Sequence, residues 1–484
     1  MQLLVIQRIL GILLMIFSST MVPPMLVSIL YADGALEPFF WAFAVTLITG
    51  IVLWLPVKSQ RRELRLRDGF LVVVLFWTVL GSFGALPLLL SEQLDIRPID
   101  AFFESISGLT TTGATVLTGI DFLPKAILYY RQQLQWLGGM GIIVLAVAIM
   151  PMLGIGGMQL YKAETPGPVK DTKLTPRITE SAKALWYIYL SLTVACMLAY
   201  RIAGMNWFDA LAHSFSTVAI GGYSTHDASM GHFIATPAVE VVAIVFMFLS
   251  AINYSLHFIA WRQRSLRGYF SDSEFRAYVS ILLVVGLITS VYLYHQGVFD
   301  TPGQTLINSI FQTVSIGTTT GFTTHQYHLW PGFLPALLLF TSFIGGCAGS
   351  TAGGLKVIRF VMLLKQGRRE VMRVIHPHAV VPIKLGGHPV SNRILDAVWG
   401  FFAAYVGLFS IMLLLLMFDG MDQITAFSAV AACMNNLGPG LGEVGNNYAG
   451  ISDFAKGLLS FAMLLGRLEI FTLLVLLTPA FWRT

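Results

Sequence analysis

Four short stretches that combine glycine with hydroxyl, amide or apolar side chains recur along this sequence of 484 residues. They read LTTTG, VAIGG, GTTTG and MNNLG and span Leu109–Gly113, Val218–Gly222, Gly317–Gly321 and Met434–Gly438. Glycine reaches positive φ at little cost, so such a stretch can turn consecutive carbonyl oxygens to one side. A ring of four carbonyl groups replaces the water around a cation without adding formal charge. The stretches therefore predict a path for a dehydrated monovalent cation.

Each stretch should follow a short helix. Thirteen positions before each final glycine stands a residue type that often caps a helix N-terminus, namely Asp100, Asp209, Asn308 and Thr425. The helix between cap and stretch would have about ten residues, too few to cross a membrane. We therefore expect a re-entrant half-helix whose carbonyl end, with roughly half a negative charge, faces the ion path.

The composition requires a membrane. Hydrophobic residues make up 56% of the chain and charged residues only 11%, against about 25% charge in soluble domains. Apolar runs of roughly 20 residues recur throughout, and the first, Ile6–Leu30, is expected to be a retained helix and not a signal peptide. The predicted fold is an all-α polytopic membrane protein. Four tandem units, each a helix, a pore helix, a loop and a second helix, surround a central pseudo-four-fold pore. The units are expected in residues 68–155, 180–265, 274–366 and 391–484, and two further spans precede them in residues 1–67.

Loop charge predicts the orientation. One set of loops is basic and includes the segment Lys356–Lys384, whereas the alternating set carries acids such as Asp95, Asp121 and Asp227. Because Lys and Arg are retained on the cytoplasmic side, both termini are expected inside. This rule already explains the basic loops, so nucleic-acid binding is not expected; a partner protein or anionic lipid headgroups would both suit them.

Six segments together resemble the TrkH/KtrB/HKT superfamily of K⁺ transporters, and bacterial TrkH most. They are Ser107–Thr115, Thr217–Thr225, Ser315–Thr324, Asn435–Gly442, Gly345–Lys356 (GGCAGSTAGGLK) and Gly466–Glu469 (GRLE). The resemblance covers essentially the whole chain. It implies potassium uptake across a bacterial inner membrane, a homodimer, and a cytosolic TrkA-like regulatory subunit. A nucleotide, NAD or ATP/ADP, would bind to that subunit, and this chain would hold no cofactor besides the transported K⁺.

The resemblance also assigns the selectivity filter. Its glycines would be Gly113, Gly222, Gly321 and Gly438. In plant relatives a serine at the first of these positions accompanies Na⁺ transport, so four glycines fit a K⁺-selective pattern. The full set expected to bind the ion is Thr111, Thr112, Gly113, Ile220, Gly221, Gly222, Thr319, Thr320, Gly321, Asn436, Leu437 and Gly438. Only the first and third units supply threonine hydroxyls there, and the fourth departs furthest from the others.

A gate is expected beneath the filter. Five glycines lie within Gly345–Gly354, and each costs a helix roughly 1 kcal/mol relative to alanine. The segment is either a closely packed small-residue helix or a broken, pore-wetted loop, and the resemblance favours a gating loop. The gating residues would be Gly345, Gly346, Gly349, Ser350, Thr351, Gly353, Gly354 and Arg467. The spacing GxxxxGK[ST] of a phosphate loop is absent.

Arg467 lies deep in the last apolar span, where an unpaired guanidinium would cost several kcal/mol. It would either pair with Glu469 or loop carbonyls, or border the pore as a positive charge that slows cations. We favour the second, because residues two apart on a helix point to different faces and the pair with Glu469 is therefore disfavoured.

Two other classes of function are disfavoured. A membrane enzyme would gather carboxylates or histidines, whereas the acids here are dispersed, so no enzymatic activity is expected. A cation-coupled secondary transporter, K⁺/H⁺ or Na⁺ symport, stays open as the alternative, with Glu104, Glu240 and Glu469 as the main acids for coupling. A secondary transporter of organic substrates would favour inverted repeats, whereas the repeats here run in the same direction.

Overall fold

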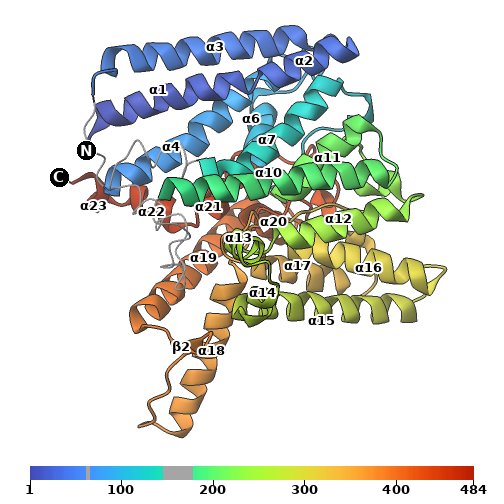
Figure 1. Cartoon of the computed structure of the whole chain (residues 1–484), viewed down its shortest axis with the longest axis vertical. Coiled ribbons are helices and arrows are strands. Elements are labelled where there is room, and N and C mark those ends of the chain that lie inside the picture. The colour runs from blue at the N-terminus through green and yellow to red at the C-terminus, as the bar shows by residue number, and fades with distance from the viewer. Residues whose placement is uncertain (61–65, 145–177, 484) are drawn as a thin grey trace.

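The computed structural model describes residues 1–60, 66–144 and 178–483, and these are helical apart from turns and one short hairpin (Figure 1). The long helices run side by side in one bundle, and the N and C termini lie close together at one end of it (Figure 1). The prediction of an all-α protein is confirmed for these residues. The expected end of the first unit, at residue 155, lies outside the described residues.

Three helices precede the repeated part of the chain: α1 (Leu3–Ser19), α2 (Val22–Tyr31) and α3 (Leu36–Trp54), followed by a 3₁₀ turn, Leu55–Val57. Helices α1 and α3 pack closely because Gly11 and Gly50 face each other's backbone. A Cβ on Gly11 would lie 2.8 Å from the Gly50 carbonyl oxygen, and one on Gly50 would lie 2.9 Å from that of Gly11. Small residues permit this backbone approach between helices in lipid.

An order of helix, short helix, turn and helix then recurs four times. The first pass contains α4 (Leu66–Gly84), α5 (Leu86–Leu89), α6 (Pro98–Leu109), η2 (Ile120–Phe122) and α7 (Lys125–Val144). The second contains α10 (Ile178–Ile202), α11 (Trp207–Ala219), η5 (Ser229–Phe233), α12 (Pro237–Ser250), α13 (Tyr254–Gln263) and α14 (Arg267–Ser271). We refer to these passes, and to the two that follow them, as units 1 to 4.

Unit 3 contains α15 (Ser273–His295), α16 (Pro302–Gly317), η6 (Tyr327–Leu329), α17 (Leu334–Ile344) and α18 (Val357–Ile375). A two-stranded antiparallel hairpin, β1 (Lys384–Leu385) and β2 (His388–Pro389), joins it to unit 4. Unit 4 contains α19 (Asn392–Phe418), α20 (Gln423–Met434), η7 (Gly442–Val444), α21 (Asp453–Arg467), α22 (Phe471–Leu477) and α23 (Pro479–Trp482). Helix α18 and the start of α19 project beyond the bundle (Figure 1).

The predicted caps of the short helices α6, α11, α16 and α20 were wrong. The N-cap residues are Arg97, Asn206, Thr301 and Asp422, because each has the extended backbone that precedes a helix. The residues expected as caps, Asp100, Asp209, Asn308 and Thr425, lie inside these helices and are all buried. Three of their side chains instead hold the chain that returns after the glycine turn: Thr225 donates to Asp209, Thr324 donates to Asn308, and the Glu443 amide donates to Thr425. Asp100 instead pairs with Lys456 at 2.6 Å.

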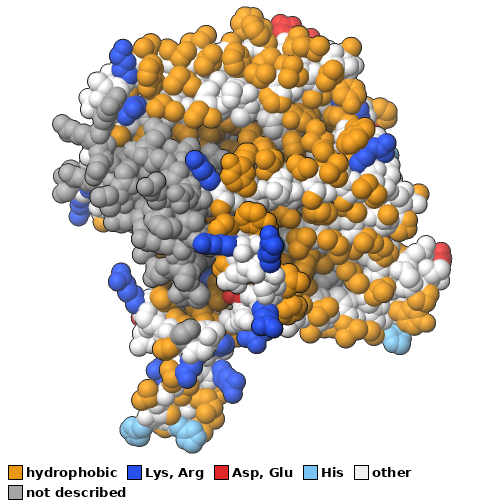
Figure 2. Space-filling view, in the orientation of Figure 1, with side chains coloured by type: hydrophobic (Ala, Val, Ile, Leu, Met, Phe, Trp, Pro, Cys, Tyr) orange, Lys and Arg blue, Asp and Glu red, His pale blue; other side chains and the backbone are white. Residues whose placement is uncertain are grey.

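The outer surface of the bundle is apolar. Figure 2 shows hydrophobic side chains over most of the visible face of the long helices, with Lys and Arg gathered around the projecting α18. On α15, Leu283, Val284 and Leu287 are 57–68% exposed, as expected for side chains that face lipid. Six described helices are long and apolar enough to span a membrane by length and composition alone, or eight if each of two bent pairs counts as one span.

The two remaining expected spans are unusual for identifiable reasons. Helix α7 carries Arg131, Gln132, Gln133 and Gln135, all buried in the protein, so its described part is too polar for that criterion. Helix α17 has only 11 residues because Gly345, with φ of 69°, ends it at Ile344. The bent pairs are α12 with α13, at 93°, and α21 with α22, at 117°.

Candidate functional site

The four short helices end in the same backbone motif. The amides of Thr112, Gly221, Thr320 and Leu437 each donate to the carbonyl oxygen five residues earlier, at 2.7–2.8 Å. The residue before each of these, namely Thr111, Ile220, Thr319 and Asn436, is left-handed, with φ between 53° and 67°. This is a Schellman ending, which glycine usually provides. A β-branched residue such as Ile220 pays roughly 1–2 kcal/mol for that conformation, so the surrounding structure must hold the turns in place.

The glycine two residues further on also has positive φ in every unit: 82° at Gly113, 79° at Gly222, 83° at Gly321 and 98° at Gly438. In each turn, two residues with positive φ therefore flank one residue with negative φ. The four turns have the same local geometry although only glycine is common to all of them.

These glycines close a ring. A Cβ on Gly113 would lie 2.1 Å from the Gly221 carbonyl oxygen, and one on Gly222 would lie 2.1 Å from that of Thr320. The same construction on Gly321 reaches the Leu437 oxygen at 2.0 Å, and on Gly438 it reaches the Thr112 oxygen at 2.6 Å. Each glycine thus abuts the carbonyl that precedes the next glycine, from unit 1 to unit 4 and back to unit 1. Any larger residue would have to displace backbone, and we call this arrangement the glycine ring.

The expected filter residues are all brought together here, but their side chains are engaged within the protein. The hydroxyl groups of Thr112 and Thr320 bond to those of Thr110 and Thr318, at 2.8 and 2.7 Å. Asn436 donates to Thr112 at 2.9 Å, which links unit 4 to unit 1. The backbone carbonyls, and not these hydroxyls, are therefore the groups whose arrangement the four units share.

Three tyrosines that the sequence analysis missed support the chain just after the ring. Tyr223 donates to the Ala114 carbonyl at 3.2 Å, and Tyr327 donates to that of Gly440 at 3.0 Å. Tyr448 donates to the Gly438 carbonyl at 2.7 Å. The sequence offered a signal, since Tyr223 directly follows the glycine of unit 2.

The glycine-rich loop Gly345–Lys356 lies against the glycine ring and contacts the end of the short helix, or its turn, in units 2, 3 and 4. Thr351 donates to the Val218 carbonyl of unit 2 at 3.0 Å. The Gly353 amide donates to the Thr319 hydroxyl at 2.7 Å, and the Gly354 amide donates to the Asn435 carbonyl at 3.1 Å. A Cβ on Gly353 would lie 2.0 Å from that same Asn435 oxygen. The segment is therefore a loop and not the continuous small-residue helix that was the alternative.

Arg467 completes these contacts on the side of unit 1. Its Nη1 donates to the Thr111 hydroxyl at 3.2 Å and to the Thr351 carbonyl at 3.3 Å, and its Nη2 donates to the Gly138 carbonyl at 2.5 Å. The guanidinium also lies over the Trp77 ring, 5.3 Å from its centre. One cation thus joins the glycine ring, the glycine-rich loop and α7.

Glu469 does not pair with Arg467. Its carboxylate lies 2.5 Å from Arg359 Nη2, in the first turn of α18, and the two side chains are 17% and 6% exposed. Glu104 is paired as well, with Arg131 at 2.8 Å, and both are fully buried. Two of the three acids considered for proton coupling are therefore held by arginines.

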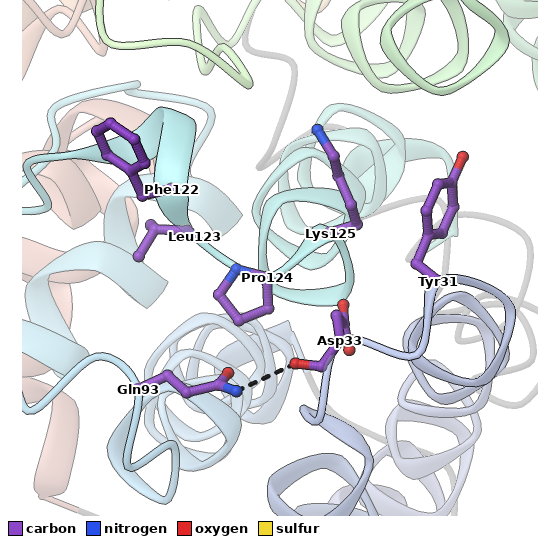
Figure 3. Close-up of a pocket in the computed structure, with 7 residues that line it drawn as sticks. All are labelled: Tyr31, Asp33, Gln93, Phe122, Leu123, Pro124 and Lys125. Atoms are coloured by element: carbon purple, nitrogen blue, oxygen red, sulfur yellow. Dashed lines mark hydrogen bonds between the residues drawn. The ribbon is translucent and has the colours of Figure 1, made fainter.

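A cavity of about 390 Å³ lies between the C-terminal end of α2, the loop before α6 and the N-terminal end of α7. It is lined by Tyr31, Asp33, Gln93 and Phe122–Lys125 (Figure 3). Gln93 donates to the Asp33 carbonyl across its floor at 3.0 Å. The cavity shares no residue with the glycine ring or the glycine-rich loop, so we assign it no part in ion passage.

Comparison with known proteins identifies the class. Residues 35–483 match the model of the TrkH family, described as a cation transport protein, and the chain belongs to this family. It is therefore a polytopic membrane transporter and not an enzyme.

Among its relatives, the Trk system potassium uptake protein TrkH of Halomonas elongata is 59% identical over the full length of both chains. The protein of the same name from Escherichia coli K12 is 55% identical over 99% of each. The crystal structure of the potassium transporter TrkH from Vibrio parahaemolyticus superimposes with a TM-score of 0.91 over all of both chains, at 55% identity.

Proposed function

We propose that this chain carries K⁺ into a bacterial cell through the glycine ring. The observation that carries the proposal is the closure of the ring from four turns with one backbone geometry. The names of the relatives, potassium uptake proteins, support K⁺ as the ion. The ion-binding groups would be backbone oxygens of Thr111–Gly113, Ile220–Gly222, Thr319–Gly321 and Asn436–Gly438.

The chemistry follows from desolvation. K⁺ that leaves water needs oxygen ligands in place of its hydration shell, and the carbonyl groups of the four turns would provide them. Each of the helices α6, α11, α16 and α20 ends at the ring, so its C-terminal dipole adds roughly half a negative charge there. Four such ends favour a cation over an anion, and no carboxylate is needed in the ring itself.

Gating is the second part of the proposal. The glycine-rich loop would close the path below the ring, with Gly345, Gly346, Gly349, Gly353 and Gly354 allowing it to turn. At the ring it is held to units 2, 3 and 4 by hydrogen bonds to Val218, Thr319 and Asn435, each contributing about 1 kcal/mol, and Arg467 links it to unit 1. Arg467 would hold the loop and place a positive charge beside the ion path.

The remaining parts of the proposal concern surroundings. The chain would lie in the bacterial inner membrane with both termini in the cytoplasm, as the positive-inside rule suggests. It would form a homodimer and bind a cytosolic, nucleotide-binding regulatory subunit, for which the projecting basic helix α18 is a suitable contact. The word "system" in the names of the relatives supports partner subunits in general.

The test compares two glycines of one loop. Gly113 and Gly119 both have positive φ, at 82° and 66°, but a Cβ on Gly119 would meet only the edge of Phe122 at 4.0 Å. Gly113→Ser must push the Gly221 oxygen from 2.1 Å to beyond 3.0 Å, whereas Gly119→Ser displaces nothing. We expect K⁺ and Rb⁺ flux into proteoliposomes to exceed Na⁺ and Li⁺ flux for the unmodified protein and Gly119→Ser, and Gly113→Ser to reduce that preference.

Equal selectivity in both serine variants would contradict a filter at the glycine ring. Absence of all cation flux would be followed by a repeat with the regulatory subunit added, and continued absence would refute the transport proposal.

A further inference from the structure

Two histidines and a carboxylate gather beyond the glycine ring, between units 1 and 2. Asp121 comes from η2 of unit 1, His226 comes from the loop before η5 of unit 2, and His232 lies in η5 itself. One potential ligand atom from each lies within 4.8 Å of the others. His226 Nδ1 is 2.5 Å from the Asp121 carboxylate, and the two imidazoles stack in parallel with centres 3.5 Å apart.

A second carboxylate orients the cluster from behind. His226 Nε2 faces Asp209 at 3.4 Å, and Asp209 is only 3% exposed. Asp209 is itself held by Thr225, at 2.8 Å, and by the Asn206 amide, at 2.6 Å. Histidines that bind metal usually direct their other nitrogen to such a buried carboxylate, which fixes the ring and makes it a better ligand.

We propose that Asp121, His226 and His232 bind one divalent transition cation, of which Zn²⁺ is the representative, and that this ion ties the loops of units 1 and 2 together. Imidazole nitrogen and carboxylate oxygen suit Zn²⁺, and water would complete a four-coordinate site. Bonds of about 2.0–2.1 Å in a tetrahedron require ligand atoms roughly 3.3 Å apart. The ligand atoms, which lie up to 4.8 Å apart, must therefore approach by as much as roughly 1.5 Å. His226 Nδ1 and the Asp121 carboxylate, at 2.5 Å, must instead separate, and one imidazole must turn out of the parallel stack. Asp121 and His232 are exposed, which leaves space for these movements.

The third unit provides a built-in comparison. His325 stands four residues after Gly321, just as His226 stands four residues after Gly222. There, however, Asn308 occupies the place of Asp209, and His325 packs edge-on against Phe299 with ring centres 5.0 Å apart. The buried acidic partner of the imidazole, Asp209, therefore occurs in unit 2, and the matching position of unit 3 holds Asn308 instead.

The test measures binding and does not depend on ion transport. Untagged protein in lipid nanodiscs, with K⁺ in excess, is titrated with Zn²⁺ by calorimetry, and Co²⁺ serves as a second probe through its visible absorption. We expect one tight site in the unmodified protein and at least a tenfold weaker one in His226→Gln, His232→Gln and Asp121→Asn. The matched control His325→Gln should bind as the unmodified protein does.

His232→Gln changes an exposed side chain, so it keeps the test decisive if His226→Gln folds poorly. Zn²⁺ should also raise the melting temperature of the unmodified protein and of His325→Gln, and raise that of His232→Gln by less, because binding to the folded state alone stabilises it. The proposal would be overturned if the unmodified protein bound no Zn²⁺ up to about 1 mM, since a specific site would bind more tightly than that. Equal loss of Zn²⁺ affinity in His226→Gln and His325→Gln would also overturn it.

Discussion

Replacing Arg467 by alanine tests how the glycine-rich loop is held. The guanidinium donates to the Thr351 carbonyl of the loop at 3.3 Å and to the Thr111 hydroxyl of the glycine ring at 3.2 Å. The first of these bonds exists only while the loop lies against the ring. Arg467→Ala should therefore destabilise the closed position and raise K⁺ flux.

The size of the effect follows from the bond to the loop. A hydrogen bond with a charged donor contributes about 1.5–3 kcal/mol. Because Arg467 is half-buried, the lower end applies, and 1.4 kcal/mol corresponds to about a tenfold change in an equilibrium. The open fraction, and with it the K⁺ flux, should rise about tenfold as long as the closed state predominates.

Two variants distinguish a tether from a simple charge barrier. Arg467→Lys keeps the positive charge, but an ammonium group cannot reproduce the fork that reaches Thr111, Thr351 and Gly138 together. Loss of the tether predicts raised flux in both variants, whereas a charge barrier alone predicts raised flux only in Arg467→Ala. Arg276→Ala, at an exposed position on α15, is the control for the loss of an arginine.

Flux is measured in proteoliposomes with the amount of inserted protein determined for each variant. Unchanged or lower K⁺ flux in Arg467→Ala, at normal abundance and thermal stability, would refute the idea that this residue restrains the path.

Two further predictions concern buried polar groups. Glu104→Gln leaves the Arg131 guanidinium buried without its carboxylate, which should cost about 3–5 kcal/mol of stability. The melting temperature in detergent should therefore fall clearly, whereas Arg97→Ala, at an exposed ion pair, should change it little. Equal shifts in the two variants would contradict this reasoning. Tyr448→Phe removes the 2.7 Å hydrogen bond to the Gly438 carbonyl, which contributes about 1 kcal/mol, so the ratio of K⁺ to Na⁺ flux should fall by up to about fivefold. Tyr294→Phe, at an exposed position, is the control. An unaltered ratio in Tyr448→Phe would mean that the ring does not depend on this hydrogen bond.

Much of the architecture could be predicted because it depends on local chemistry. The glycines at equal register in the four units have positive φ, and the loop at Gly345–Gly354 interrupts a helix, as its composition indicated. The cap positions were wrong because Asp and Asn favour caps and buried hydrogen bonds alike, and only packing decides between these roles. Asp209, for example, lies within α11 and accepts a bond from Thr225.

Other features depend on residues far apart in the chain. The left-handed conformation of Ile220 could not be inferred, since a β-branched residue disfavours it and only the surrounding contacts enforce it. Likewise, Arg359 and Glu469 come together across 110 residues. Helix geometry disfavoured the pair of Arg467 with Glu469, but no local pattern indicated Arg359 as the partner.

The sequence by itself determined the class of protein, the four repeated turns and the residues in them, because hydropathy, glycine content and register are properties of short segments. Only the tertiary structure decided that the turns close into a ring, that Arg467 joins this ring to the glycine-rich loop, and that Asp121 meets His226. Each of these contacts links groups from different units of the chain, and their geometry depends on how whole helices pack.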